Sequence, residues 1–188
     1  MYTHADIVVG KTPLKKGDLS VFMRLGTDYK NNYYEYEIPL TITPEGQYSG
    51  NNYNDQLAVW PQDNMFDFAL EILKNLKLER NKEKRKAGSA ITFTTPYTGY
   101  DPERPSNRIT VMGNPSLAEV NVIMIGVRNT SNSSKSGEVW VNELRLTDFD
   151  EEGGWAAQGS LNIAFSDIGT LSITGRKETA GFGSIDQS

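Results

Sequence analysis

Hydrophobic and polar residues alternate along several short segments of this chain, most strictly near its C-terminus. Residues 157–166 read AQGSLNIAFS, with Leu161, Ile163 and Phe165 at every second position between small polar residues. Residues 170–176 repeat the pattern after a turn at residues 167–169. Because successive side chains of a strand point to opposite faces, each segment has one apolar and one polar face. The pattern predicts a β-hairpin.

Two kinds of hairpin share this pattern. Strands of a transmembrane barrel have about 9–11 residues, alternate with a period of two and are joined by short turns. A hairpin of a water-soluble sheet, with one face on a core and the other in solvent, alternates in the same way. The alternation alone favours the water-soluble hairpin, because such hairpins are common, and the membrane hairpin is the alternative. Two strands cannot close a barrel, so the membrane interpretation makes this chain a piece of a larger protein.

The first third of the chain also predicts strands. Residues 21–25 alternate, and residues 33–42 alternate again with apolar or aromatic residues at the even-numbered positions. Pro39 has no N–H to donate to a ladder, and we expect it at an edge or a bulge. Residues 43–55 are rich in Gly, Asn and Pro and predict a surface loop.

One helix is predicted, over residues 64–78. Apolar residues recur at helical spacing from Met65 to Leu76. A strand is the alternative, because alternate residues from Phe66 to Ile72 are also apolar. The charged residues Lys74 and Lys77 beyond them favour the helix.

Four later segments predict further strands. Residues 90–94 and 108–112 are short and rich in residues that favour strands. Residues 120–127 are apolar on both faces, which predicts a central strand buried on both sides. Residues 138–146 predict a strand that is half covered and half exposed. Together the elements predict a mostly β fold, an antiparallel β-sandwich of jelly-roll type with one helix.

The overall charge argues against a nucleic-acid partner. The net charge is −5, whereas phosphate binding needs clustered positive charge. One basic run departs from this average. It has two interpretations: a site for an anionic partner or lipid head groups, or a solvated helix end. Acidic residues at the start of the same segment favour the helix end. The run contains Lys74, Lys77, Arg80, Lys82, Lys84, Arg85 and Lys86.

The residue types that carry enzyme chemistry are nearly absent. His4 is the single histidine, in a terminus we expect to be polar and mobile, and there is no cysteine. Neither a Ser-His or Cys-His pair nor a zinc set is therefore available. An acidic cluster predicts either a calcium site or, in preference, a solvated linker; it consists of Asp148, Asp150, Glu151 and Glu152. We predict no catalytic, cofactor-binding or metal-binding residue, and no enzyme.

Several tyrosines give a second hypothesis. They lie in or near predicted loops and can stack on sugars through their apolar faces, although packing at the rim of a sandwich is the commoner role. A glycan-binding jelly-roll module at the cell surface is therefore the alternative function. The tyrosines are Tyr29, Tyr33, Tyr48, Tyr53, Tyr97 and Tyr100.

Four long blocks in one order carry a resemblance that covers nearly the whole chain. Residues 18–40 begin DLSVFMRLG, residues 96–117 begin PYTGYDPERP, residues 137–157 begin GEVWVNELRL, and residues 171–188 read LSITGRKETAGFGSIDQS. The chain resembles the SprA/Sov family of outer-membrane translocons of the type 9 secretion system of Bacteroidetes. Members of this family serve protein export and, in some species, gliding motility.

The resemblance implies a fragment of a much larger outer-membrane barrel. On this view residues 1–152 form a sandwich domain inserted between barrel strands, and residues 153–188, from Gly153 and Gly154 onward, are a barrel-type hairpin. The implied function is that of a non-enzymatic structural or interaction domain, either periplasmic or exposed at the cell surface. The implied partners are other secretion-system subunits or exported proteins. Self-association through the exposed apolar face of the hairpin is a further expectation.

Overall fold

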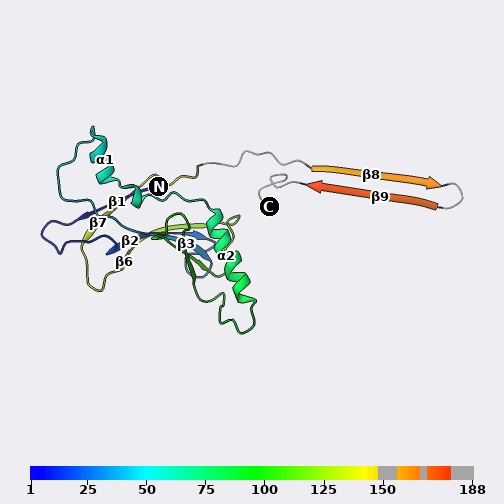
Figure 1. The fold of residues 1–188 in the computed structure, drawn as a ribbon, viewed down its shortest axis with the longest axis horizontal. Coiled ribbons are helices and arrows are strands. Elements are labelled where there is room, and N and C mark those ends of the chain that lie inside the picture. The colour runs from blue at the N-terminus through cyan, green and yellow to red at the C-terminus, as the bar shows by residue number, and fades with distance from the viewer. Residues whose placement is uncertain (148–155, 166–168, 179–188) are drawn as a thin grey trace. The chain divides into compact units, whose positions relative to one another are not determined.

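The computed structural model describes residues 1–147, 156–165 and 169–178. The chain divides into two compact units, Met1–Arg145 and Leu146–Ser188. The described residues form nine strands, two α-helices and one short 3₁₀ helix (Figure 1), and each strand pairing is antiparallel. The predicted fold class, mostly β with antiparallel sheets, is confirmed. The predicted domain boundary between residues 152 and 153 lies outside the described residues.

A five-stranded sheet dominates the first unit. Its strands follow the order β4-β5-β3-β2-β6, so that β3 and β2 lie in the middle and β6 lies at one edge. Pro39 ends β3 beyond the last residue that pairs with β5, where no ladder bond on that side needs its N–H. The strands are β2 (Leu19–Gly26), β3 (Tyr33–Pro39), β4 (Tyr97–Tyr100), β5 (Arg108–Met112) and β6 (Val122–Asn129).

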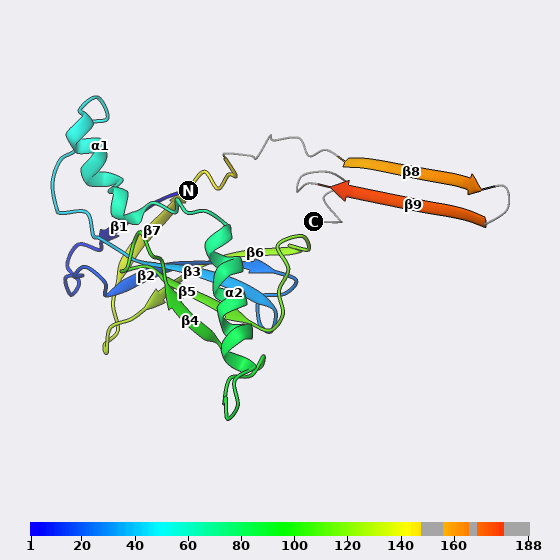
Figure 2. The same ribbon diagram turned by 45° about the vertical axis from the view of Figure 1, so that its right-hand side comes forward.

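A smaller second layer covers part of one face of this sheet. It consists of the two-stranded sheet of β1 (Tyr2–Ile7) and β7 (Gly137–Asn142), together with helix α2 (Glu71–Lys84). Figure 2 shows α2 lying across the sheet next to β5 and β4. The core between the layers includes Ala5, Val21, Tyr36, Ile38, Leu73 and Val111. The two layers of the sandwich are therefore unequal in width.

The helix starts later than the sequence predicts. α2 covers Glu71–Lys84 instead of residues 64–78, and residues 65–69 before it lie in neither a helix nor a strand. The Phe66 N–H donates to the Met1 carbonyl at 2.8 Å, and the Phe68 ring stacks on Tyr36 with 3.9 Å between ring centroids. Neither the helix nor the strand alternative therefore holds for residues 65–69, although the Phe66 and Phe68 rings pack against Tyr36 on the sheet.

A second helix and an N-terminal strand lie where the sequence predicted irregular chain. Helix α1 (Tyr53–Val59) starts inside the predicted loop, where the Asn52 side chain accepts from the Asn54 N–H at 3.0 Å. The 3₁₀ helix η1 (Gln62–Asn64) follows it. His4 does not lie in a mobile terminus, because β1 pairs with β7 along its length.

Three predicted strands differ from the structure, the first two for local reasons. Residues 90–94 are not a strand, since the Thr92 hydroxyl accepts from the Thr94 N–H at 3.2 Å and competes with ladder formation. The strand predicted to reach residue 146 ends at Asn142, because Glu143 adopts a left-handed conformation with φ of 52°. β6 is an edge strand, so the prediction of a central strand buried on both faces is wrong.

The second unit contains the predicted hairpin. β8 (Ala156–Phe165) pairs with β9 (Gly169–Glu178) from Ala156 opposite Glu178 to Phe165 opposite Gly169. Residues 166–168, which include two residues of the predicted turn, and the side chains of Leu161, Ile163 and Phe165 lie outside the described part of the structure. Self-association through this hairpin stays a prediction. Neither α-helix in the described part of the chain has the length and the apolar composition that a membrane-spanning helix needs.

Candidate functional site

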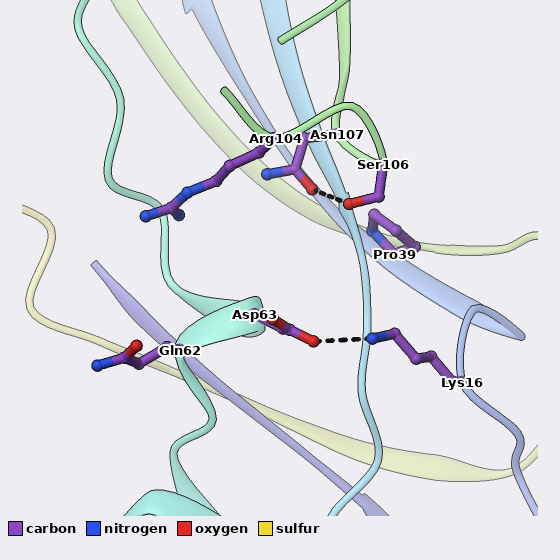
Figure 3. Close-up of a pocket in the computed structure, with 7 residues that line it drawn as sticks. All are labelled: Lys16, Pro39, Gln62, Asp63, Arg104, Ser106 and Asn107. Atoms are coloured by element: carbon purple, nitrogen blue, oxygen red, sulfur yellow. Dashed lines mark hydrogen bonds and ion pairs between the residues drawn. The ribbon is translucent and has the colours of Figure 1, made fainter. Parts of the chain in front are cut away.

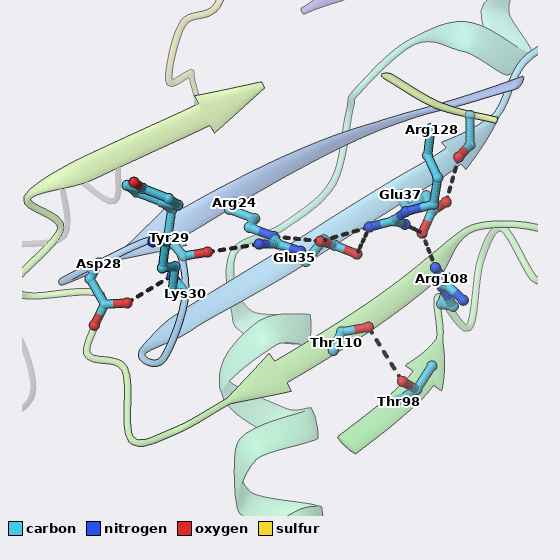
Figure 4. A network of polar contacts seen from close by, with 11 residues as sticks. Arg24, Asp28, Tyr29, Lys30, Glu35, Glu37, Thr98, Arg108, Thr110 and Arg128 are labelled. Atoms are coloured by element: carbon cyan, nitrogen blue, oxygen red, sulfur yellow. Dashed lines mark hydrogen bonds and ion pairs between the residues drawn. The ribbon is translucent and has the colours of Figure 1, made fainter. Parts of the chain in front are cut away.

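A network of ion pairs crosses the outer face of the five-stranded sheet, the face turned away from the core. The strand register brings its members together, with Arg24 directly opposite Glu35 and Ser20 between Arg128 and Pro39. Arg24 Nε lies 2.6 Å from Glu35 Oε2, and Arg128 Nη2 lies 3.2 Å from Glu35 Oε1. Glu37 accepts from Arg108, Arg128 and the Ser20 hydroxyl (Figure 4).

The two carboxylates are buried beneath the arginines. Glu35 and Glu37 are 3% and 4% exposed, whereas the Arg128 and Arg108 side chains are 30% and 41% exposed. Burial alone would raise the pKa of Glu37, but the hydrogen bonds from Ser20, Arg128 and Arg108 outweigh it and hold the pKa below its ordinary value. Both carboxylates are therefore paired, and the network joins β2, β3, β5 and β6 through their side chains.

Aromatic rings support the guanidinium groups. The Phe22 ring contacts Arg24 and Arg128, with 5.2 and 4.6 Å from each guanidinium carbon to the ring centroid. Tyr33 lies under Arg24 at 4.1 Å. Such contacts are favourable when the ring face meets the cation. Gly126 on β6 leaves the space that Phe22 occupies, since a Cβ there would meet the ring at 2.4 Å.

A polar cleft of about 420 Å³ lies where η1 meets residues 104–107 (Figure 3). Its cations already have partners: Lys16 Nζ lies 2.7 Å from Asp63 Oδ2, and Arg104 donates to the Met65 carbonyl at 2.8 Å. The hydrogen bond from Lys16 holds the pKa of Asp63 below its ordinary value. Both cations of the cleft are therefore paired, and the Lys16–Asp63 pair, being exposed, contributes little to stability.

A second cleft of about 510 Å³ includes His4, Asp6, Glu45 and Tyr48 in its lining. His4 Nδ1 lies 2.7 Å from the Val59 carbonyl oxygen and 3.0 Å from the Thr43 hydroxyl, so the ring is held in place. Sequence reasoning missed this position because it assigned His4 to an irregular terminus. Among the described residues, no group of three or more His, Cys, Asp or Glu is arranged to hold a metal ion.

The tyrosines of the glycan hypothesis come from separate segments. Tyr33 is buried, and the Tyr97 hydroxyl donates to Glu79 at 2.9 Å. Tyr48 is part of the second cleft, in which the carboxylates of Asp6 and Glu45 are also found. The remaining exposed tyrosines are Tyr29, Tyr53 and Tyr100.

The basic run divides between packing and solvent. Arg80 is fully buried and donates to the Gly113 carbonyl, while its guanidinium lies 4.7 Å from the centre of the Phe93 ring. Lys77 Nζ donates to the Pro115 carbonyl at 2.7 Å. The other five cations are exposed, as a solvated helix end requires. The acidic cluster Asp148, Asp150, Glu151 and Glu152, with Gly153 and Gly154, lies outside the described residues.

The inner side of β6 carries exposed aliphatic residues. Ile123, Ile125 and Val127 are 54%, 36% and 50% exposed. The register sets them beside Leu25, Met23 and Val21 on the core face of β2. We call these three β6 residues the apolar edge. Sequence reasoning identified the apolar character of β6 but could not show that the second layer stops short of it.

Comparison with known proteins identifies a family. The family model SprA_N, described as motility related/secretion protein, matches residues 1–188, the full chain. No curated protein matches the chain.

Proposed function

Because this chain belongs to the SprA_N family of motility related/secretion proteins, we propose that it is part of the outer-membrane translocon of a type 9 secretion system of Bacteroidetes. Its first unit would serve there as a non-enzymatic interaction domain, facing either the periplasm or the cell surface. Its partners would be other secretion-system subunits or exported proteins. The β8–β9 hairpin would belong to the barrel wall of the parent protein, as its strand length and alternation suit.

The observation that carries the proposal is the adjacency of the two ends of the first unit. Tyr2 pairs with Asn142 across β1 and β7, so the chain enters and leaves this unit at neighbouring points. Domains with adjacent ends can be inserted into a larger chain without disturbing its path. The apolar edge adds a surface of the kind that marks protein contacts.

Replacement of residues 1–145 in the parent protein by a short Gly/Ser linker tests the proposal. The linker suffices because Tyr2 and Asn142 are paired neighbours. We expect the parent to reach the membrane but to lose secretion or the recovery of partner subunits. A control carries Leu78→Glu in the intact protein, since Leu78 is 59% exposed and lies outside both clefts. Unchanged secretion and unchanged partner recovery after the replacement would refute an interaction role.

The second cleft supports a second candidate function, a glycan-binding module. Tyr48 offers an aromatic face, and Asp6 and Glu45 offer acceptors for sugar hydroxyls. Calorimetric titration of the first unit with a panel of glycans tests it, with Tyr48→Ala as the binding variant and Tyr53→Ala as the control. The glycan hypothesis requires binding that Tyr48→Ala removes and Tyr53→Ala retains; failure of the whole panel to bind at about millimolar strength rejects it.

A further inference from the structure

Strand β6 has an unpaired edge. It pairs with β2 on one side, and no strand in the described part of the chain pairs with its other side. The unpaired backbone N–H and C=O groups of such an edge are matched in spacing by another extended strand. The opposite edge of the sheet is better protected, because β4 has only four residues and contacts α2.

The apolar edge gives the inner side of this strand its chemistry. Ile123, Ile125 and Val127 point to the core side of the sheet, yet each is more than a third exposed. On β7 the register sets Val141 opposite the buried Thr3, and Val141 is 41% exposed. The edge of the five-stranded sheet therefore leaves the interior-facing side chains of β6 in water. A strand added to β6 would cover them with apolar residues at every second position.

The ion-pair network on the outer face of the sheet has an excess of positive charge. Three arginines, Arg24, Arg108 and Arg128, meet two carboxylates there, Glu35 and Glu37. Arg128 belongs to β6 itself, and its side chain is 30% exposed. An acidic residue on an added strand, placed next to Arg128, would balance this charge.

We propose that β6 is a strand-addition site for an extended segment of a partner protein, with apolar residues at alternate positions and an acidic residue beside Arg128. The inference rests on the proposed interaction function and specifies the partner's chemistry. A second copy of this chain fits less well. Antiparallel pairing of two β6 strands about Ile125 sets Val122 opposite Arg128 and supplies no carboxylate.

A synthetic peptide of about eight residues, the length of β6, tests the site. It has valine at every second position, threonine between the valines and one glutamate in place of a threonine. We expect it to bind the first unit and to slow hydrogen exchange at the β6 amides. A peptide of the same composition with its valines in consecutive positions should bind about tenfold more weakly. Equal affinity for both peptides, or protection away from β6, would overturn the proposal.

Two further arms locate the contact. Ile125→Lys should weaken peptide binding about tenfold because edge lysines block strand addition, whereas Val9→Lys, at another exposed apolar residue, should have no effect. Peptides N-methylated on alternate residues give a test that leaves the protein unchanged. The methyl groups remove the N–H donors from one edge of the peptide strand. Of the two alternately methylated isomers, only the one whose unmethylated edge faces β6 should bind. Equal binding of both isomers, or unchanged binding by Ile125→Lys, contradicts strand addition.

Light scattering tests the alternative in which a second copy of this chain, and not a partner protein, occupies the edge of β6. A dimer that forms without peptide and protects the β6 amides would make a second copy the occupant and would overturn the proposed partner. Failure of the peptide experiments also differs from failure of the proposed function. If strand addition fails but the proposed function holds, the Gly/Ser replacement of residues 1–145 would still abolish secretion or partner recovery, and β6 would play no part in that function.

Discussion

Arg128 forms an ion pair with Glu37, although the two residues lie two strands apart in the five-stranded sheet. β2 passes between their strands, and its Ser20 donates a hydroxyl hydrogen bond to the same carboxylate. The edge strand β6 is thereby connected to the central strand β3 through side chains as well as through the backbone of β2. An edge held in this way is a firm template for a partner strand.

Glu37→Gln should destabilise the first unit. The substitution removes the charge that Arg108 and Arg128 face, and it leaves two cations without their shared carboxylate. We expect a loss of about 2–3 kcal/mol, below the range for fully buried pairs because both arginines are partly exposed. Urea denaturation measures the effect, with the exposed Glu45→Gln as control at about 0.5 kcal/mol or less. Equal stability of the two variants would contradict a structural role for the network.

The sequence predicted the elements of the sheet better than their arrangement. The alternation of β2, β3 and the hairpin is local, and these strands formed close to the predicted bounds. The position of β6 depends on strand order and on how far the second layer extends, which are properties of distant segments. An apolar segment such as residues 120–127 is typical of a buried strand. The same segment at an edge exposes every second residue, as β6 does.

The ion-pair network on the outer face of the sheet was not predicted from the sequence, for a related reason. Glu35 and Glu37 alternate with core residues and therefore belong to an outer face, which the pattern does indicate. Their partner Arg128 lies about 90 positions away along the chain, and only the pairing of β6 with β2 brings it near. Residue spacing contains no information on such a contact.

Asp28 should contribute an acid-sensitive part of the stability. Hydrogen bonds from the Asn31 backbone, the Asn32 side chain and the Lys30 backbone lower its pKa from 3.8 to about 2. Because the folded pKa is lower than the unfolded one, this contribution is present above about pH 4 and is lost as the pH falls towards 2. Asp28→Asn should therefore be less stable than the original protein at neutral pH, and the difference should shrink below pH 4. A pH-independent difference in urea unfolding would refute this assignment.

Gly126→Ala should disturb the aromatic support of the arginines. Its Cβ would meet the Phe22 ring at 2.4 Å, and the ring contacts both Arg24 and Arg128. Moving the ring costs about 1–3 kcal/mol, the range for overpacking. Gly50→Ala is the matched control, because a Cβ at Gly50 meets nothing within 4 Å. Thermal unfolding compares the two variants, and a Gly126→Ala protein as stable as Gly50→Ala would mean that Phe22 moves freely.

Tyr36→Phe should destabilise the core without changing its packing. The Tyr36 hydroxyl donates to Asp101 Oδ2 at 2.6 Å and accepts from Asn107 Nδ2 at 2.9 Å. Tyr36, Asp101 and Asn107 are all buried, so removal of the hydroxyl leaves two buried polar groups without this partner. The expected loss is about 1–3 kcal/mol in urea denaturation, against about 0.5 kcal/mol or less for the exposed control Tyr100→Phe.

The alkaline behaviour of the same variant gives an independent check. Burial, followed by the hydrogen bond to Asp101, raises the pKa of Tyr36 well above its ordinary value of 10.0. A raised folded pKa means that the stability from the neutral phenol is complete below pH 10 and is lost as the pH rises further. The original protein should therefore lose stability more steeply than Tyr36→Phe as the pH rises above about 10. Identical slopes would show that the hydroxyl is in contact with solvent and would contradict the buried Tyr36–Asp101–Asn107 cluster.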